Sequence, residues 1–338
     1  MAPNPNNQWR STTPSRRPAN GAQPRYPWRS DKRIFSYSLR RAKRKFSHPI
    51  VTANATFRVD AHTELDIIEL LLTRGAPLAA GTPKLIVTPN MNHLAILQSS
   101  PEMGEAYRRA DLYLPDGWPV VRLAQLLGVE ILARTTGSGI VERLAKLQGE
   151  GRRILVIGGS TLASSQRAAA RLVEAGWSVR SHEASAEWLA RDESIADLAA
   201  LADEFQPDIV LVGLGAIKQE VLALALMRES TAPAVYLGVG AAIDFLADEV
   251  ARAPVWMQRV HLEFFHRILV RPGPMIRRYV GDVAPYFSVV RQSLRAARAD
   301  DARRRAGGSG SGGSPGIAQR PVGLRSSGRE SDGVSVVA

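Results

Sequence analysis

The segment "PDIVLVGLGAIKQE" at residues 207–220 decides the fold class. Its apolar run, residues 209–212, is short and lacks polar alternation, which indicates a strand buried on both faces. Two glycines end this strand, and Lys218, Gln219 and Glu220 then open a helical pattern. Similar apolar runs at 84–90, 152–160 and 233–240 alternate with helical segments. We therefore predict an α/β protein, a Rossmann-like parallel sheet with helices on both faces.

The two ends of the chain differ in composition from its middle. Residues 1–50 hold twelve Lys/Arg and one acidic residue, so they carry +11 of the net charge of +12. This segment and the Gly/Ser-rich residues 301–338 lack the apolar side chains that a core needs, and both are predicted to be disordered tails. Between them we expect an α/β core at 52–254 and a C-terminal amphipathic helical appendage at 255–300.

Composition also limits the class of protein. The 338 residues include no cysteine, which excludes disulfides, thiolate metal sites and a cysteine nucleophile. No run of about 18 apolar residues is present, and the N-terminal residues do not read as a secretory signal, which favours a cytoplasmic location. Because the basic charge lies in a tail and the predicted core is nearly neutral, nucleic acid is not an expected partner. The sequence leaves a homo-oligomer open.

Ligands of parallel sheets bind beyond the carboxyl ends of the strands, so we expect the strand ends of this sheet to line one crevice. Asp116 follows a strand in "YLPDGW", where its carboxylate is placed to accept a proton from a substrate hydroxyl. The alternative is that Asp116 only caps an Asp-Gly turn. The glycine turns "VIGGS" and "GLG" resemble phosphate-binding turns, with tight strand-to-helix turns as the alternative.

Several nucleotide and metal signatures are missing. Neither glycine turn completes G-x-G-x-x-G and no Walker sequence occurs, which disfavours the alternative of a nucleotide-binding oxidoreductase or epimerase on the same fold. The chain has no D-x-D and no H-x-x-x-H pair, so no metal site is predicted. If a diphosphate leaves in the crevice, cations must neutralise it, and the candidates are Arg134, Lys218 and Arg252. His93 is assigned to capping or packing.

Eight segments form an ordered set of motifs across residues 84–287. They are "TPNMNH" (88–93), "DLYLPDGWPVV" (111–121), "RTTGS" (134–138), "VIGG" (156–159), "PDIVLVGLGAIKQE" (207–220), "LGVGAAIDFLADEVARAPVW" (237–256), "LEFFHRI" (262–268) and "RRY" (277–279). In this order and spacing the set resembles the WecG/TagA/CpsF family of bacterial glycosyltransferases (glycosyltransferase family 26).

The resemblance implies an activity. Members of the family transfer a sugar from a UDP-sugar to a saccharide linked to undecaprenyl diphosphate at the cytoplasmic face of the membrane. Known donors carry N-acetylmannosamine, its uronic acid or glucose. The reaction inverts the anomeric carbon and needs no metal or other cofactor. This chain is then expected to act in cell-surface polysaccharide synthesis as a peripheral membrane enzyme, with a UDP-sugar and a polyprenyl-diphosphate-linked acceptor as partners.

The resemblance also implies roles for residues. The general base of the family falls on Asp116, a sugar-orienting pair on Thr88 and Asn90, an arginine on Arg134 and a glutamine on Gln219. The other expected substrate-binding residues are Gly117, Gly158, Gly159, Gly213, Gly215, Lys218, Glu220, Gly240, Asp244 and Arg252. Two positions depart from the family pattern: Ile217 stands where proline is usual, and Gly139 where aspartate is common.

Residues 255–279 combine a broad apolar surface with arginines, a pattern typical of a helix lying on an anionic membrane. The alternative is a helix packed on the sheet with its arginines in water. In the resembled family this appendage caps the active site, and its arginines meet the lipid diphosphate, a role that here falls on Arg267, Arg271, Arg277 and Arg278. The basic tail, residues 1–50, would add to the attraction for anionic lipid.

Overall fold

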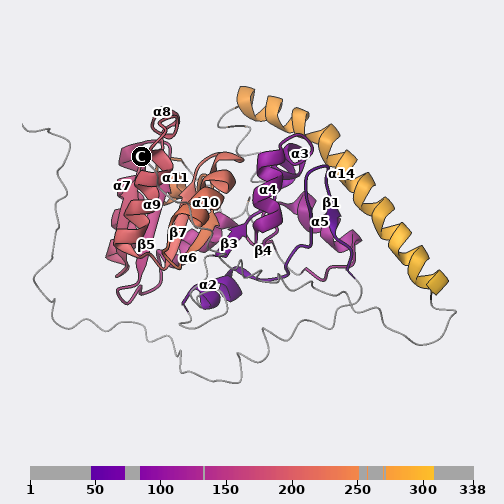
Figure 1. The fold of residues 1–338 in the computed structure, drawn as a ribbon, viewed down its shortest axis with the longest axis horizontal. Helices are drawn as coiled ribbons and strands as arrows, with labels where there is room; N and C mark the ends of the chain where they lie inside the picture. The colour runs from indigo at the N-terminus through magenta and orange to yellow at the C-terminus, as the bar shows by residue number, and fades with distance from the viewer. Residues whose placement is uncertain are drawn as a thin grey trace, which may run out of the picture. The chain divides into compact units, whose positions relative to one another are not determined.

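The structure is a computed structural model that describes residues 47–72, 84–131, 134–250, 257, 269 and 272–307. Its centre is a six-stranded sheet in which every neighbouring pair is parallel, with the order β4-β3-β8-β7-β5-β6. The strands are β3 (Lys84–Val87), β4 (Leu112–Tyr113), β5 (Arg153–Gly158), β6 (Ser178–His182), β7 (Ile209–Gly213) and β8 (Val235–Gly238). Figure 1 shows this sheet between layers of helices. The predicted α/β class is confirmed.

Each central strand supplies side chains to two separate cores. In β5, Ile154 and Val156 join one apolar cluster, while Leu155 and Ile157 join the other. In β7, Ile209 and Leu211 alternate with Val210 and Val212 in the same way. All of these side chains are fully buried, because successive residues of a strand point to opposite faces of a sheet that is covered on both.

The helices divide between the two faces of the sheet. One face is covered by α3 (Met91–Ile96), α4 (Pro101–Arg109), α5 (Trp118–Leu126), α9 (Ser194–Phe205) and α10 (Lys218–Glu229). The other is covered by α2 (Glu64–Leu72), α6 (Gly137–Leu144), α7 (Leu162–Glu174) and α11 (Ala242–Leu246). The short α8 (Ala186–Leu189) lies beside α9. Side-chain oxygens of Asn90, Ser100, Thr136 and Thr161 cap the N-termini of α3, α4, α6 and α7.

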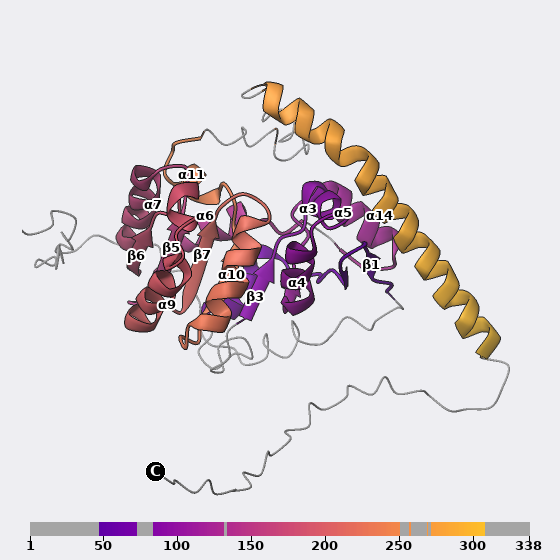
Figure 2. The same ribbon diagram turned by 45° about the horizontal axis from the view of Figure 1, so that its top comes forward.

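A long C-terminal helix, α14 (Pro272–Gly307), packs against α3 and the hairpin strand β1 (Ile50–Val51), which pairs with β2 (Thr56–Phe57). Figures 1 and 2 both show α14 running past α3 and β1. The shorter of its hydrogen bonds to other elements come from both sides: Arg278 Nε donates to Asn92 Oδ1 (3.1 Å), Tyr286 Oη to the Pro119 carbonyl (2.9 Å), and the Val51 amide to Ser293 Oγ (2.9 Å).

Two predicted boundaries need correction. The sequence places Ile50 at the end of a disordered tail, yet this residue is 1% exposed and pairs with Phe57. The second predicted tail begins at 301, yet α14 continues to Gly307. Both errors have the same cause, because each tail was predicted from the average polarity of its segment. Such an average does not show a single apolar residue, or the last turns of a helix, that tertiary packing keeps ordered. Most of the two tails and Arg252, Arg267 and Arg271 lie outside the described residues.

Candidate functional site

A cleft of about 370 Å³ opens at the carboxyl ends of the strands. Its walls come from the segments after β3, β4, β5, β7 and β8, and α14 contributes Arg278. Among the predicted site residues it brings together Thr88, Asn90, Asp116, Gly159, Gly213, Gly215, Lys218, Gln219, Gly240, Asp244 and Arg278. Gly117, Arg134, Gly158, Glu220 and Arg277 are described but do not line it. The six-strand topology therefore gathers most of the predicted site.

Asp116 lies in the loop between β4 and α5 and lines the cleft while half-buried. Its amide donates to the Pro89 carbonyl (3.1 Å), which joins this loop to the segment after β3. Gly117 caps α5, and a Cβ there would approach Asn90 Cβ at 3.4 Å, so the two loops pack closely. Thr88 Oγ1 donates to the Gly238 carbonyl (3.2 Å) and ties β3 to β8. Asp116 thus stands on a fixed backbone at the rim.

The turn at residues 215–220, here called the Lys-Gln-Glu turn, is held by its own side chains. Ile217 has a φ of 76°, a left-handed conformation that is costly for a β-branched residue. The buried carboxylate of Glu220 accepts the Ile217 amide at Oε2 (2.9 Å) and Gln219 Nε2 at Oε1 (2.7 Å). Gln219 Oε1 in turn accepts the Gly240 amide (2.9 Å). The turn is therefore locked to the loop after β8.

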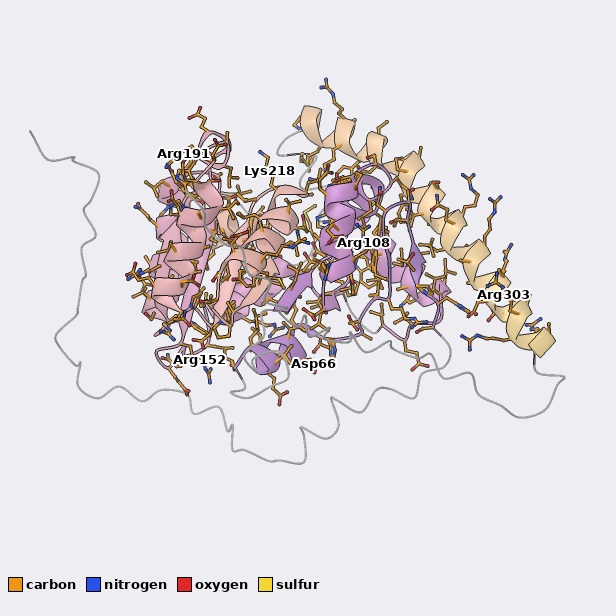
Figure 3. All side chains as sticks on the ribbon, in the orientation of Figure 1. Asp66, Arg108, Arg152, Arg191, Lys218 and Arg303 are labelled. Atoms are coloured by element: carbon orange, nitrogen blue, oxygen red, sulfur yellow. The ribbon has the colours of Figure 1, made fainter. Side chains whose placement is uncertain are left out.

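This network explains the departure at position 217. Proline is limited to a φ near −65°, so it cannot adopt the 76° that this turn has. Gln219 and Glu220 are 3% and 1% exposed, and these hydrogen bonds hold their side chains within the protein. Lys218 is exposed and lines the cleft; Figure 3 labels it at the N-terminal end of α10. The buried pair shapes the turn, and Lys218 presents its charge.

The turn after β5 has a backbone conformation that requires glycine. Gly158 and Gly159 have φ values of 93° and 108°, and a Cβ on Gly158 would lie 2.7 Å from the Gly213 carbonyl oxygen. Asp244 Oδ1 accepts the Ser160 amide (2.7 Å) and Ser164 Oγ (2.6 Å). Asp244, predicted to bind substrate, thus also holds the start of α7 against the cleft.

A residue that sequence reasoning missed compensates for the departure at position 139. A Cβ on Gly139 would fall 1.8 Å from Glu64 Oε1. That carboxylate accepts Thr136 Oγ1 (2.9 Å) and Arg143 Nε (3.0 Å), and the Thr136 amide lies 3.4 Å away. An acidic residue three positions after an N-cap normally makes this contact with the cap amide. Glu64, from α2, supplies the carboxylate that position 139 lacks, and no local sequence signal links the two.

A second hollow of about 720 Å³ lies between α6, α7 and α11. It shares Ser138, Ala242 and Phe245 with the cleft, so the two adjoin at these residues. Ion pairs flank it, Glu142 with Lys146 (2.5 Å) and Arg171 with Asp248. Sequence reasoning did not find this hollow, because residues that line a groove between helices look like ordinary surface positions.

Within residues 47–72, 84–131, 134–250, 257, 269 and 272–307, no three His, Cys, Asp or Glu side chains gather as a metal site would need. In the same ranges no helix is both long and apolar enough to cross a bilayer.

Comparison with known proteins assigns the chain to a family. A family model described as "Glycosyl transferase WecG/TagA/CpsF family" matches residues 54–299, which include the cleft and most of α14. The chain belongs to this family. It is also 28% identical, over 198 residues, to an N-acetylglucosaminyldiphosphoundecaprenol N-acetyl-beta-D-mannosaminyltransferase of Bacillus spizizenii. That alignment covers 56% of this chain and 72% of the relative. The chain is thus a glycosyltransferase, as its motifs indicate.

Proposed function

We propose that this chain transfers a sugar from a UDP-sugar to a polyprenyl-diphosphate-linked saccharide in cell-surface polysaccharide synthesis, with inversion and without a metal ion. The name of the Bacillus relative includes both an undecaprenyl-diphosphate-linked sugar and a mannosaminyl group, which supports this substrate class. The observation that carries the proposal is the shared cleft: Asp116 and the Lys-Gln-Glu turn line it together in a member of this family.

The proposed chemistry is a single displacement. The acceptor hydroxyl gives its proton to the Asp116 carboxylate while its oxygen attacks the anomeric carbon. A new glycosidic C–O bond forms as the bond between that carbon and the β-phosphate oxygen breaks, and UDP leaves with the electron pair. Attack and departure on opposite faces of the sugar ring invert its configuration. Asp116 suits the base role because it is at the rim of the cleft and only half-buried.

The charge on the leaving UDP needs positive partners. Lys218 is exposed into the cleft, and the helices α7 and α10 begin at its wall, where their amide groups and dipoles favour an anion. Gly159 lines the cleft with a φ of 108°, so the turn after β5 brings backbone, without a side chain, to the wall where a phosphate would lie. These features replace the role that a divalent ion has in other transferases.

The acceptor lipid approaches from the side of α14. Arg278 lines the cleft, and Arg277 is exposed beside it. The opposite face of α14 carries a row of exposed apolar side chains, here called the apolar stripe: Ile276, Val280, Val283 and Phe287. These positions recur at helical spacing, so they share one face. Such a stripe beside arginines fits the surface of an anionic membrane, which favours peripheral binding at the cytoplasmic leaflet.

The proposal is tested with a panel of UDP-sugars and a short-chain prenyl-diphosphate-linked N-acetylglucosamine acceptor, with EDTA present throughout. We expect transfer from one donor, with an inverted product and unchanged rate in EDTA. Calorimetry with UDP alone should give binding without added metal. Rates that fall to background in EDTA and return with Mg²⁺ would reject the metal-independent mechanism. No UDP binding and no transfer from any donor would reject the function.

A further inference from the structure

Asn92, in the motif "TPNMNH", has no role in the proposed chemistry. It lies in the first turn of α3, two residues after Asn90, and does not itself line the cleft. Its Oδ1 accepts a hydrogen bond from Arg278 Nε (3.1 Å), although 186 positions separate the two residues. A guanidinium has only donors, so the amide must present its oxygen to Arg278. This contact joins α3 to the arginine that α14 places in the wall of the cleft.

The turn that carries Asn92 has a fixed place relative to the proposed base. Asn90 Oδ1 accepts a backbone amide of the first turn (3.1 Å) and so caps α3, and Asn90 also lines the cleft. The Pro89 carbonyl, one residue before that cap, accepts the Asp116 amide (3.1 Å). The segment before α3 thus links Asn92 to Asp116. The hydrogen bond from Arg278 therefore sets the place of the guanidinium relative to Asp116, in addition to fastening α14.

The contact does not offset the charge of Arg278, because an amide is neutral. A carboxylate at the same place would form an ion pair with the guanidinium. Asp282, one turn further along α14, has its Oδ2 3.9 Å from Arg278 Nε, which is beyond hydrogen-bond distance. The bond to Asn92 uses Nε, and the two terminal nitrogens of a guanidinium form a fork that binds phosphate oxygens in pairs. A neutral group at one edge suits an arginine that has to bind an anion.

We propose that Asn92 is a positioning residue: its neutral amide oxygen holds the Arg278 guanidinium at the wall of the cleft and leaves its charge for the diphosphate of the acceptor. Without this hydrogen bond, the arginine side chain has to be ordered when the diphosphate binds, and the lost rotamer freedom weakens binding. Asn92 touches no substrate, so it acts through Arg278. The inference rests on the proposed function for the identity of the diphosphate.

The test is calorimetry on the full chain with two probes: UDP alone for the donor side, and farnesyl diphosphate in the presence of saturating UDP for the acceptor side. Asn92→Ala removes the hydrogen bond. We expect farnesyl diphosphate to bind about tenfold more weakly, the loss that follows from ordering one arginine side chain, and UDP to change by less than about threefold. In transfer assays the acceptor KM should rise in proportion, with kcat nearly unchanged.

Asn92→Asp separates positioning of the charge from simple fastening. The carboxylate keeps an oxygen for Arg278 and forms an ion pair with it, so α14 stays attached and Tm should not fall. The charge of Arg278 is then offset, and farnesyl diphosphate should again bind about tenfold more weakly. A residue that only fastens α14 would tolerate this change with normal affinity.

Two further variants make the test specific. Ser293→Ala is the matched control, because Ser293 Oγ accepts the Val51 amide (2.9 Å) and so also ties α14 to another element, far along the helix from Arg278. It should bind both probes as the wild type does. In an Arg278→Ala background, Asn92→Ala should change the farnesyl diphosphate affinity by less than about twofold, because the side chain that it positions is gone.

Four results would overturn the proposal: an Asn92→Ala variant that binds farnesyl diphosphate normally, an Asn92→Asp variant that does so, equal losses for both probes, and additive losses in the double variant. Failure of the wild type to bind farnesyl diphosphate would overturn it too. The proposed function fails by a different result, when the wild type transfers no sugar from any donor even though both probes bind.

Discussion

Replacing Gly139 by alanine tests how Glu64 supports the start of α6 beside the cleft. The new Cβ would fall 1.8 Å from Glu64 Oε1 and displace the carboxylate from Thr136 and Arg143. The hydrogen bond from Thr136 to a charged acceptor is worth about 1.5–3 kcal/mol, and the half-exposed Arg143 pair about 0–1 kcal/mol. Alanine stabilises a helix by about 0.5–1 kcal/mol relative to glycine, which offsets part of this loss. The net loss is about 0.5–3.5 kcal/mol, and each kcal/mol lowers Tm by about 2–4 °C in a domain of this size.

The assay is thermal unfolding followed by circular dichroism for a double-mutant cycle. Glu64→Ala alone should cost a similar amount, because it removes the same contacts. In the Glu64→Ala background Gly139→Ala has nothing left to displace and should be neutral or stabilising. Glu64→Ala with Gly139→Asp returns a carboxylate to the cap of α6 and should recover stability. Equal costs for Gly139→Ala in both backgrounds would refute the reasoning, since the two sites would then be independent.

Three more predictions address the cleft and α14. Asp116→Asn should lower the transfer rate by a factor on the order of 10²–10⁴, with UDP affinity and Tm unchanged; a fully active variant removes the base assignment. Asp282→Asn should raise Tm at pH 7, because burial raises the pKa of this carboxyl and its protonated form favours the native state. The stabilisation by protonated Asp282 is fully present below the pKa of the unfolded chain and is lost as pH rises through the pKa of the folded chain. The Tm difference between the variant and the wild type should therefore vanish near about pH 3. A variant with a lower Tm than the wild type at pH 7 contradicts the prediction. Phe287→Glu, in the apolar stripe, should weaken binding to anionic vesicles while transfer to a detergent-dispersed acceptor stays normal; unchanged vesicle binding argues against the stripe as the membrane surface.

The fold was predictable because its signal is local. The apolar runs of β5 and β7 are short, continuous and followed by glycine turns, a pattern that indicates strands of a sheet covered on both faces. Parallel connectivity then places the carboxyl ends of the strands together, so the cleft residues Asp116, Lys218 and Asp244 could be grouped from the sequence alone. The functional roles of these residues remain predictions.

Other features depend on contacts between distant parts of the chain. Glu64 reaches Thr136 across 72 positions, and Ser293 reaches Val51 across 242. The periodicity of the sequence contains no signal for contacts between residues so far apart. The conformation of Ile217 could not be predicted for a different reason. β-branched residues rarely adopt a positive φ, so the residue type argues against the conformation that the structure shows. The hydrogen bond from the Ile217 amide to the buried Glu220 carboxylate stabilises it.

The hydrogen bonds that hold α14 constrain the number of residues in it. Arg278 and Tyr286 bond to fixed points on α3 and at the start of α5, so the number of residues between them sets the angle at which Arg278 emerges. One residue inserted there would rotate Arg278 by about 100° around the helix axis and turn its guanidinium out of the cleft. Insertions after Asp301 would leave that angle untouched. Among homologues, length changes in this helix should therefore collect near its C-terminal end, and a homologue with an altered spacing between these two anchors should carry its cation elsewhere.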